Sequence, residues 1–128
     1  MAKKTFNPSS DHPLRAQQAW QILVGLAMRR QTETYAGLAR MMYGRRAAGV
    51  LAQVLGHIAY YCQDKKLPQL NAIIVGTDRG TPGDEIPLQS ANFHEERERV
   101  YKLDWYNIIP PTALDLGAAM QRRKAGKA

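Results

Sequence analysis

Residues 34–63, TYAGLARMMYGRRAAGVLAQVLGHIAYYCQ, decide the fold that the sequence predicts. Thr34 is a natural N-cap for a short helix, and Gly44 is the kind of residue that ends one. From residue 46 to residue 63, apolar side chains return at steps of three and four, which indicates a longer helix. The stretch therefore predicts two consecutive helices, with Arg45 and Arg46 at the start of the second.

The flanking segments extend this pair into a longer pattern. Residues 14–30 predict a first helix, with Arg29 and Arg30 in its last turn. Residues 70–75 predict a buried strand, residues 76–84 a turn-rich loop, and residues 85–88 a short returning strand. This is the element order of a winged helix, in which the loop is the wing. We expect an α+β, mainly helical fold: a winged-helix-like three-helix core with a small β-hairpin wing.

The last third of the chain predicts a C-terminal extension of this core. Residues 93–102 predict a charged helix, with residues 95–99 on solvated faces, and residues 100–106 are expected to pack back on the core. Thr112 and Asp115 have the spacing of a capping box before a small final helix. We expect a flexible arm over residues 1–12, a single domain over residues 13–120 and a mobile basic tail over residues 121–128.

Composition bounds the classes of function. The chain has 128 residues, which fits one domain, and its net charge of +7 favours a polyanionic partner. The single cysteine, Cys62, excludes an internal disulfide and favours a reducing compartment. No apolar run approaches the roughly 20 residues of a membrane helix, and no secretion signal is recognisable. We expect a cytoplasmic protein with no membrane partner.

The positive charge is concentrated in residues 16–77, which carry seven basic and two acidic side chains. Arginines at the start of a helix oppose the helix dipole unless an anion lies nearby. Arginine binds phosphate or guanine edges, and glutamine pairs with an adenine edge. We therefore predict a nucleic-acid-binding surface, with duplex DNA as the expected partner and structured RNA left open. Its candidate residues are Arg45, Arg46, Gln53, His57, Tyr60 and, at the tip of the wing, Arg79.

Catalytic and metal-binding patterns are missing from the sequence. His57 and Cys62 do not share a helix face, so a thiolate–imidazole pair is not expected. His94 lacks a second histidine at metal-ligand spacing, and no glycine-rich phosphate loop precedes a lysine. We expect no enzymatic activity, no metal and no cofactor.

Two segments carry a family resemblance: ETYAGLA at residues 33–39 and GVLAQVLG at residues 49–56. They are similar to the Val-Thr-Tyr-Gly-x-Leu-Ala and Arg-Ala-Val-Gly-x-Ala-Leu-Gly motifs of the alkylguanine-DNA alkyltransferases and alkyltransferase-like proteins. The resemblance covers about residues 31–83 and implies a winged-helix DNA-binding domain, whose small-residue recognition helix approaches DNA closely. The family's reactive cysteine corresponds to Asn71 and its base-wedging arginine to Gly49. The resemblance therefore implies neither alkyl transfer nor base flipping by that route.

A second class of function stays open. A small basic domain of bacterial or phage origin also fits a protein-interaction module, or a mobile-element-encoded inhibitor or accessory subunit. Such a protein docks on an acidic partner within a nucleic-acid-processing complex. The acidic segment at residues 78–104 and the unusual segment at residues 105–112 favour this reading.

Overall fold

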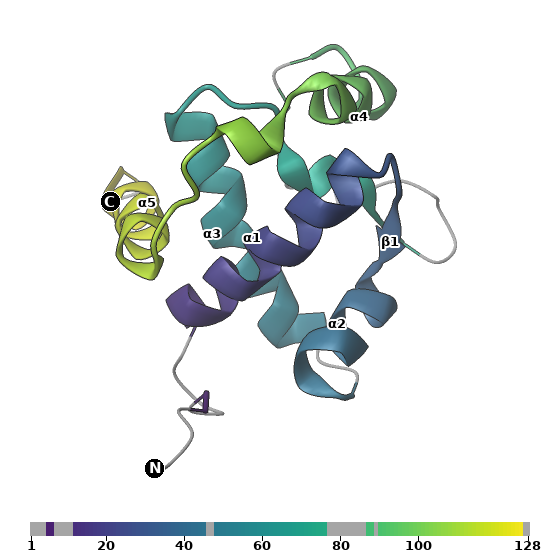
Figure 1. Ribbon diagram of the computed structural model, residues 1–128. Coiled ribbons are helices and arrows are strands. Elements are labelled where there is room, and N and C mark those ends of the chain that lie inside the picture. The colour runs from purple at the N-terminus through teal and green to yellow at the C-terminus, as the bar shows by residue number, and fades with distance from the viewer. Residues whose placement is uncertain (1–4, 7–11, 46–47, 77–86, 89, 127–128) are drawn as a thin grey trace.

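The computed structural model describes residues 5–6, 12–45, 48–76, 87–88 and 90–126, and it is mainly helical, as the sequence predicts (Figure 1). The element order is α1 (His12–Met28), β1 (Glu33–Thr34), α2 (Tyr35–Tyr43), α3 (Ala48–Asp64), η1 (Leu70–Ile73), β2 (Ile74–Val75), α4 (Phe93–Lys102), η2 (Trp105–Asn107) and α5 (Ala113–Gly126), where η denotes a 3₁₀ helix.

Helix α1 is the centre of the fold. It packs against α2, α3, α4, α5 and both 3₁₀ helices, and Figure 1 shows it crossing the middle of the molecule. Its Trp20 ring meets Tyr61 and Trp105 edge-on, with both centroid distances at 5.6 Å. Aromatic pairs in this arrangement stabilise a core beyond the area they bury. The core thus ties α1, α3 and η2 together around one tryptophan.

The end of α1 differs from the prediction. Arg29 and Arg30 were expected in the last helical turn, but the helix ends at Met28. The Arg30 N–H donates to the Ala27 carbonyl and the Gln31 N–H to the Leu26 carbonyl. This is the hydrogen-bond pattern of a Schellman motif, and Arg30 adopts the left-handed φ of 55° that the motif requires. The two arginines therefore close the helix from outside it.

The sheet also differs from the prediction. Ile74–Val75 pairs in parallel with Glu33–Thr34, and residues 70–73 form a 3₁₀ helix rather than a strand. The reason is a pair of side-chain amides: Gln69 donates to the Ala59 carbonyl and Asn71 to the Leu55 carbonyl, which holds this segment against α3. The described part of the expected returning strand, residues 87–88, is not in a strand, and residues 85–86 lie outside the described part of the chain. The described residues therefore contain no wing hairpin, and the hairpin stays a prediction.

Helix α4 spans the predicted range, but one of its carboxylates is not solvated. Glu96 is fully buried and accepts the Gln69 N–H at 2.7 Å, so it joins α4 to the start of η1. The reason is that the polar backbone before η1 is buried there and needs an acceptor. Tyr106, expected in the core, is 69% exposed, whereas Trp105 beside it is buried.

Candidate nucleic-acid interface

The start and the end of α2 are built as the sequence predicts. The Thr34 hydroxyl accepts the Gly37 N–H at 2.9 Å and caps α2. Gly44 has a left-handed φ of 72°, and its N–H donates to the Arg40 carbonyl. Both signals are local, because an N-cap hydroxyl and a left-handed glycine act within one helical turn. They end α2 so that Arg45 follows at once, before α3 begins at Ala48.

The predicted site residues differ in exposure, and two of them lie outside the described residues. Arg45 is exposed in the turn before α3, Gln53 is exposed on α3, and Tyr60 is half-buried further along that helix. Arg46 and Arg79 lie outside the described residues. The structure therefore brings Arg45, Gln53 and Tyr60 onto one helix and its preceding turn.

His57 does not face solvent, contrary to the prediction that it lies beside Gln53 in a groove. Its side chain is 7% exposed, and its Nδ1–H donates to the Gln53 carbonyl at 2.8 Å. Burial is the largest effect and lowers the pKa of His57; the Gln53 hydrogen bond opposes it, and the nearby His12 and Lys124 add smaller effects that also lower the pKa. His12 of α1 and Lys124 of α5 both act on this ring, and both helices pack against α3.

The same helix replaces the predicted basic tail. Residues 121–126 continue α5 instead of leaving it, so Arg122, Arg123 and Lys124 stand on a packed helix. The Thr112–Asp115 capping box that starts α5 is present: each backbone N–H donates to the other residue's side chain, at 3.0 and 3.1 Å. Arg122 and Arg123 of the predicted tail are thereby held against Asp64 and Tyr60 of α3, while Lys127 lies outside the described residues.

The exposed side of α3 carries few atoms. Ala52 is exposed, and a Cβ placed on the exposed Gly49 meets nothing within 4 Å. A flat helix face lets the surface of a partner approach the backbone. Gly56 differs, because a Cβ there lies 3.0 Å from Met120 Cε of α5. The open part of the face is therefore its first half, next to Arg45.

The charges of the fold are segregated along the chain. No acidic residue occurs between Glu33 and Asp64, so α2 and nearly all of α3 lack carboxylates, while Arg40 and Arg45 are exposed there. The carboxylates of the described second half include Glu95 and Glu98 on α4, which lies at the opposite end of the molecule from α2 in Figure 1. The chain from residue 34 to residue 63 therefore contributes basic side chains and no carboxylate of its own to the α2–α3 end.

Arg15 is a functional support that sequence reasoning missed. Its guanidinium lies 3.8 Å from the Phe6 ring centroid and 4.4 Å from that of Tyr43, and it donates to the Met42 carbonyl at 2.6 Å. These contacts fix the end of α2 to α1, directly before the turn that contains Arg45. In the sequence, Arg15 resembles any other surface cation, because its ring partners are distant along the chain.

The position that the family resemblance assigns to a reactive cysteine is structural here. Asn71 is buried and donates to the Leu55 carbonyl at 2.8 Å. The only thiol, Cys62, is fully buried, and burial raises its pKa to about 12. A thiol with such a pKa is not a nucleophile at neutral pH. Within the described ranges, no group of three or more His, Cys, Asp and Glu side chains is placed to hold a metal ion.

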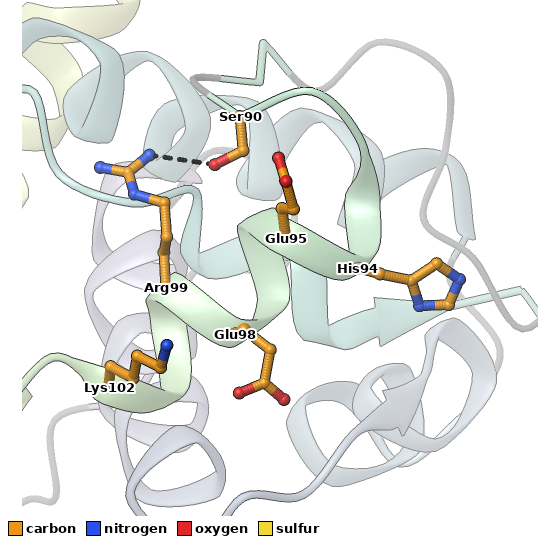
Figure 2. A pocket seen from close by; sticks show the side chains of 6 residues that line it. All are labelled: Ser90, His94, Glu95, Glu98, Arg99 and Lys102. Atoms are coloured by element: carbon orange, nitrogen blue, oxygen red, sulfur yellow. Dashed lines mark hydrogen bonds between the residues drawn. The ribbon is translucent and has the colours of Figure 1, made fainter.

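A hollow of about 400 Å³ lies on α4, apart from these residues (Figure 2). Its lining residues are Ser90, His94, Glu95, Glu98, Arg99 and Lys102. The charges of its two carboxylates and two cations balance. Arg99 donates to Ser90, and His94 points away from that pair (Figure 2). The hollow has no dominant charge to select an anionic or a cationic ligand.

No family model, curated protein or solved structure matches the chain. Among the helices that the structure describes, none combines the length and the apolar character needed to cross a membrane. The functional argument therefore rests on the chemistry of the α2–α3 end itself.

Proposed function

We propose that the protein binds nucleic acid, with duplex DNA as the partner, through the α2–α3 end and without chemistry of its own. The observation that carries the proposal is the absence of any carboxylate between Glu33 and Asp64 on a helix pair that exposes Arg40 and Arg45. A polyanion gains attraction along this surface and meets no carboxylate of the helix pair before Asp64, which is paired with Arg122.

The shape of α3 supports the same partner. Gly49 and Ala52 leave the first turns flat, so the backbone of α3 is able to lie close to the floor of a groove, with Gln53 directed at base edges. Arg45 binds phosphate in this proposal, as do Arg46 and Arg79, which lie outside the described residues. The similarity of residues 31–83 to the alkyltransferase-like DNA-binding domain agrees with it. The buried, unreactive Cys62 fits a binding protein of a reducing cytoplasm.

Salt dependence tests the proposal. For Arg45→Ala with Arg46→Ala, the slope of log K against log salt falls in magnitude by about two, because each lost phosphate contact removes about 0.9. The measurement is fluorescence anisotropy of a labelled mixed-sequence duplex at four salt concentrations. The matched control is Arg29→Ala with Arg30→Ala, which removes the same charge beside α4, where Arg30 pairs with Glu98. An equal slope for wild type and the Arg45/Arg46 variant refutes the placement.

A second candidate function has its own observation. Tyr106, Ile109 and Leu114 are large apolar side chains that are 69%, 89% and 82% exposed, in and after the segment that the sequence singled out. Exposed apolar side chains of this size favour a protein-interaction module or an accessory subunit of a nucleic-acid-processing complex. Retention of one protein partner from nuclease-treated lysate, lost in Tyr106→Ser with Ile109→Ser, supports this function; equal retention by that variant refutes it.

A further inference from the structure

Helix α5 lies against the part of α3 that follows Gln53. Met120 of α5 faces Gly56, where a Cβ would come within 3.0 Å of its Cε atom. One turn later, the Arg123 guanidinium lies 5.3 Å from the centre of the Tyr60 ring. The second half of the α3 face is therefore not open to a partner, and α5 presents its own side chains there instead.

The basic side chains of α5 differ in the contacts that they make. Arg122 is engaged with Asp64, donating from Nε at 3.2 Å and from Nη2 at 2.8 Å. Arg123 and Lys124 are exposed, and Arg123 is held over an aromatic ring rather than by a carboxylate. A ring contact of this kind orients a guanidinium and leaves its N–H groups to other acceptors. Lys124 is the next residue of α5 and is exposed, and its charge makes the smallest contribution to the lowered pKa of His57 on α3.

Helix α3 itself carries no Lys or Arg, so the basic side chains beside it come from the preceding turn, with Arg45, and from α5, with Arg123 over Tyr60. At about 1.5 Å of rise per residue, α3 separates Ala48 from Tyr60 by roughly 18 Å. A partner that lies along this length meets Arg45 before the start of the helix and Arg123 beside Tyr60.

We propose that Arg123 and Lys124 of α5 bind phosphates of the same duplex that the α2–α3 end contacts, and that Tyr60 is a positioning residue that holds Arg123 in place. The inference rests on the proposed function and adds a second phosphate-binding element to it. It assigns α5 a role in binding rather than that of a cover over the recognition helix. In this proposal the Tyr60 ring orients Arg123 and does not contact a base directly.

The test compares salt slopes for the same labelled duplex. Arg123→Ala with Lys124→Ala lowers the magnitude of the slope by about two. Arg29→Ala with Arg30→Ala, the same loss of charge beside α4, leaves it at the wild-type value. Tyr60→Ala lowers the slope by about one through Arg123, and Tyr60→Phe, which keeps the ring, restores it. Far-ultraviolet circular dichroism confirms that each variant is folded, and the Arg123/Lys124 variant tests the inference even where Tyr60→Ala unfolds.

The outcomes separate the two proposals. If the wild-type protein does not bind the duplex, the proposed function fails and this inference fails with it. If the Arg45/Arg46 variant loses slope while the Arg123/Lys124 variant keeps it, only the inference is overturned. Tighter binding by the Arg123/Lys124 variant also overturns it, because α5 would then act as a cover.

Discussion

Replacing Arg15 by alanine is the sharpest test of how the α2–α3 end is held. The guanidinium is half-buried between the Phe6 and Tyr43 rings, and it donates to Gln18 at 2.8 Å as well as to the Met42 carbonyl at 2.6 Å. The substitution removes both ring contacts and leaves a carbonyl near the end of α2 without its charged donor.

The expected cost follows from these contacts. A hydrogen bond from a charged donor contributes about 1.5–3 kcal/mol, and each partly exposed cation–π contact about 0.5–1 kcal/mol. Ordering the long side chain offsets roughly 1–2 kcal/mol of this sum. We therefore expect Arg15→Ala to lower the free energy of unfolding by about 2 kcal/mol, which in a domain of this size lowers the melting temperature by roughly 8 °C.

Urea denaturation followed by circular dichroism measures this loss. Arg29→Ala is the matched control, because Arg29 is exposed and its hydrogen bond to Gln31 at 3.3 Å is on the surface, so a change below about 0.5 kcal/mol is expected. Arg15→Lys keeps the charge but not the planar group between two rings, and its stability falls between the other two. If Arg15→Ala is as stable as the Arg29 control, the stack does not hold α2.

Three further predictions concern backbone, pH and reactivity. Gly25→Ala stabilises α1 by about 0.5–1 kcal/mol, because a Cβ there meets nothing within 4 Å. Lys66→Gly stabilises the end of α3 by about 1 kcal/mol, because Lys66 has a left-handed φ of 57°. An unchanged urea midpoint contradicts either prediction. His57 has its pKa lowered from 6.5 by burial, so the unfolded chain binds its proton more readily. The stability from neutral His57 is complete above about pH 6.5 and falls as the pH drops below that value. We therefore expect the urea midpoint of His57→Gln to change less between pH 7.5 and 5.5 than that of the wild type. Equal changes of the midpoint with pH in the two proteins refute the assignment. Iodoacetamide labels Cys62 in urea but not in the folded protein, because burial raises its pKa to about 12; rapid labelling of the folded protein contradicts this.

The sequence was most informative where structure is decided locally. The Thr34 cap, the Gly44 stop and the Thr112–Asp115 box each act within one helical turn, and all three are present. The apolar repeat of α3 likewise predicts its buried side, because a helix that packs on one side repeats its contacts every three or four residues.

Contacts between distant segments decided the rest. The aliphatic run from Leu70 resembles a strand, but amide hydrogen bonds from Gln69 and Asn71 to α3 make most of it a 3₁₀ helix. Glu96 resembles a solvated charge until the backbone of Gln69 is placed beside it. Neither partner is visible from the local pattern of residues.

The candidate site divides in the same way. Gln53 is exposed, as the periodicity of α3 predicts, and Arg45 is exposed in the turn before that helix, whereas His57 is buried. The basic run after residue 120 reads as a tail because nothing near it in the sequence indicates a packing surface. Its partners, Tyr60 and Asp64, lie on α3.

The contact between α1 and α5 has a consequence for biosynthesis. Gln17 of α1 accepts the Ala113 N–H, and Pro13 lies against Gly117, so α1 is completed by a helix that leaves the ribosome long after it. Until then, the nascent chain exposes the side of α1 and α3 that α5 later covers. Nascent chains from which α5 has not yet emerged are therefore prone to aggregate or to recruit a chaperone.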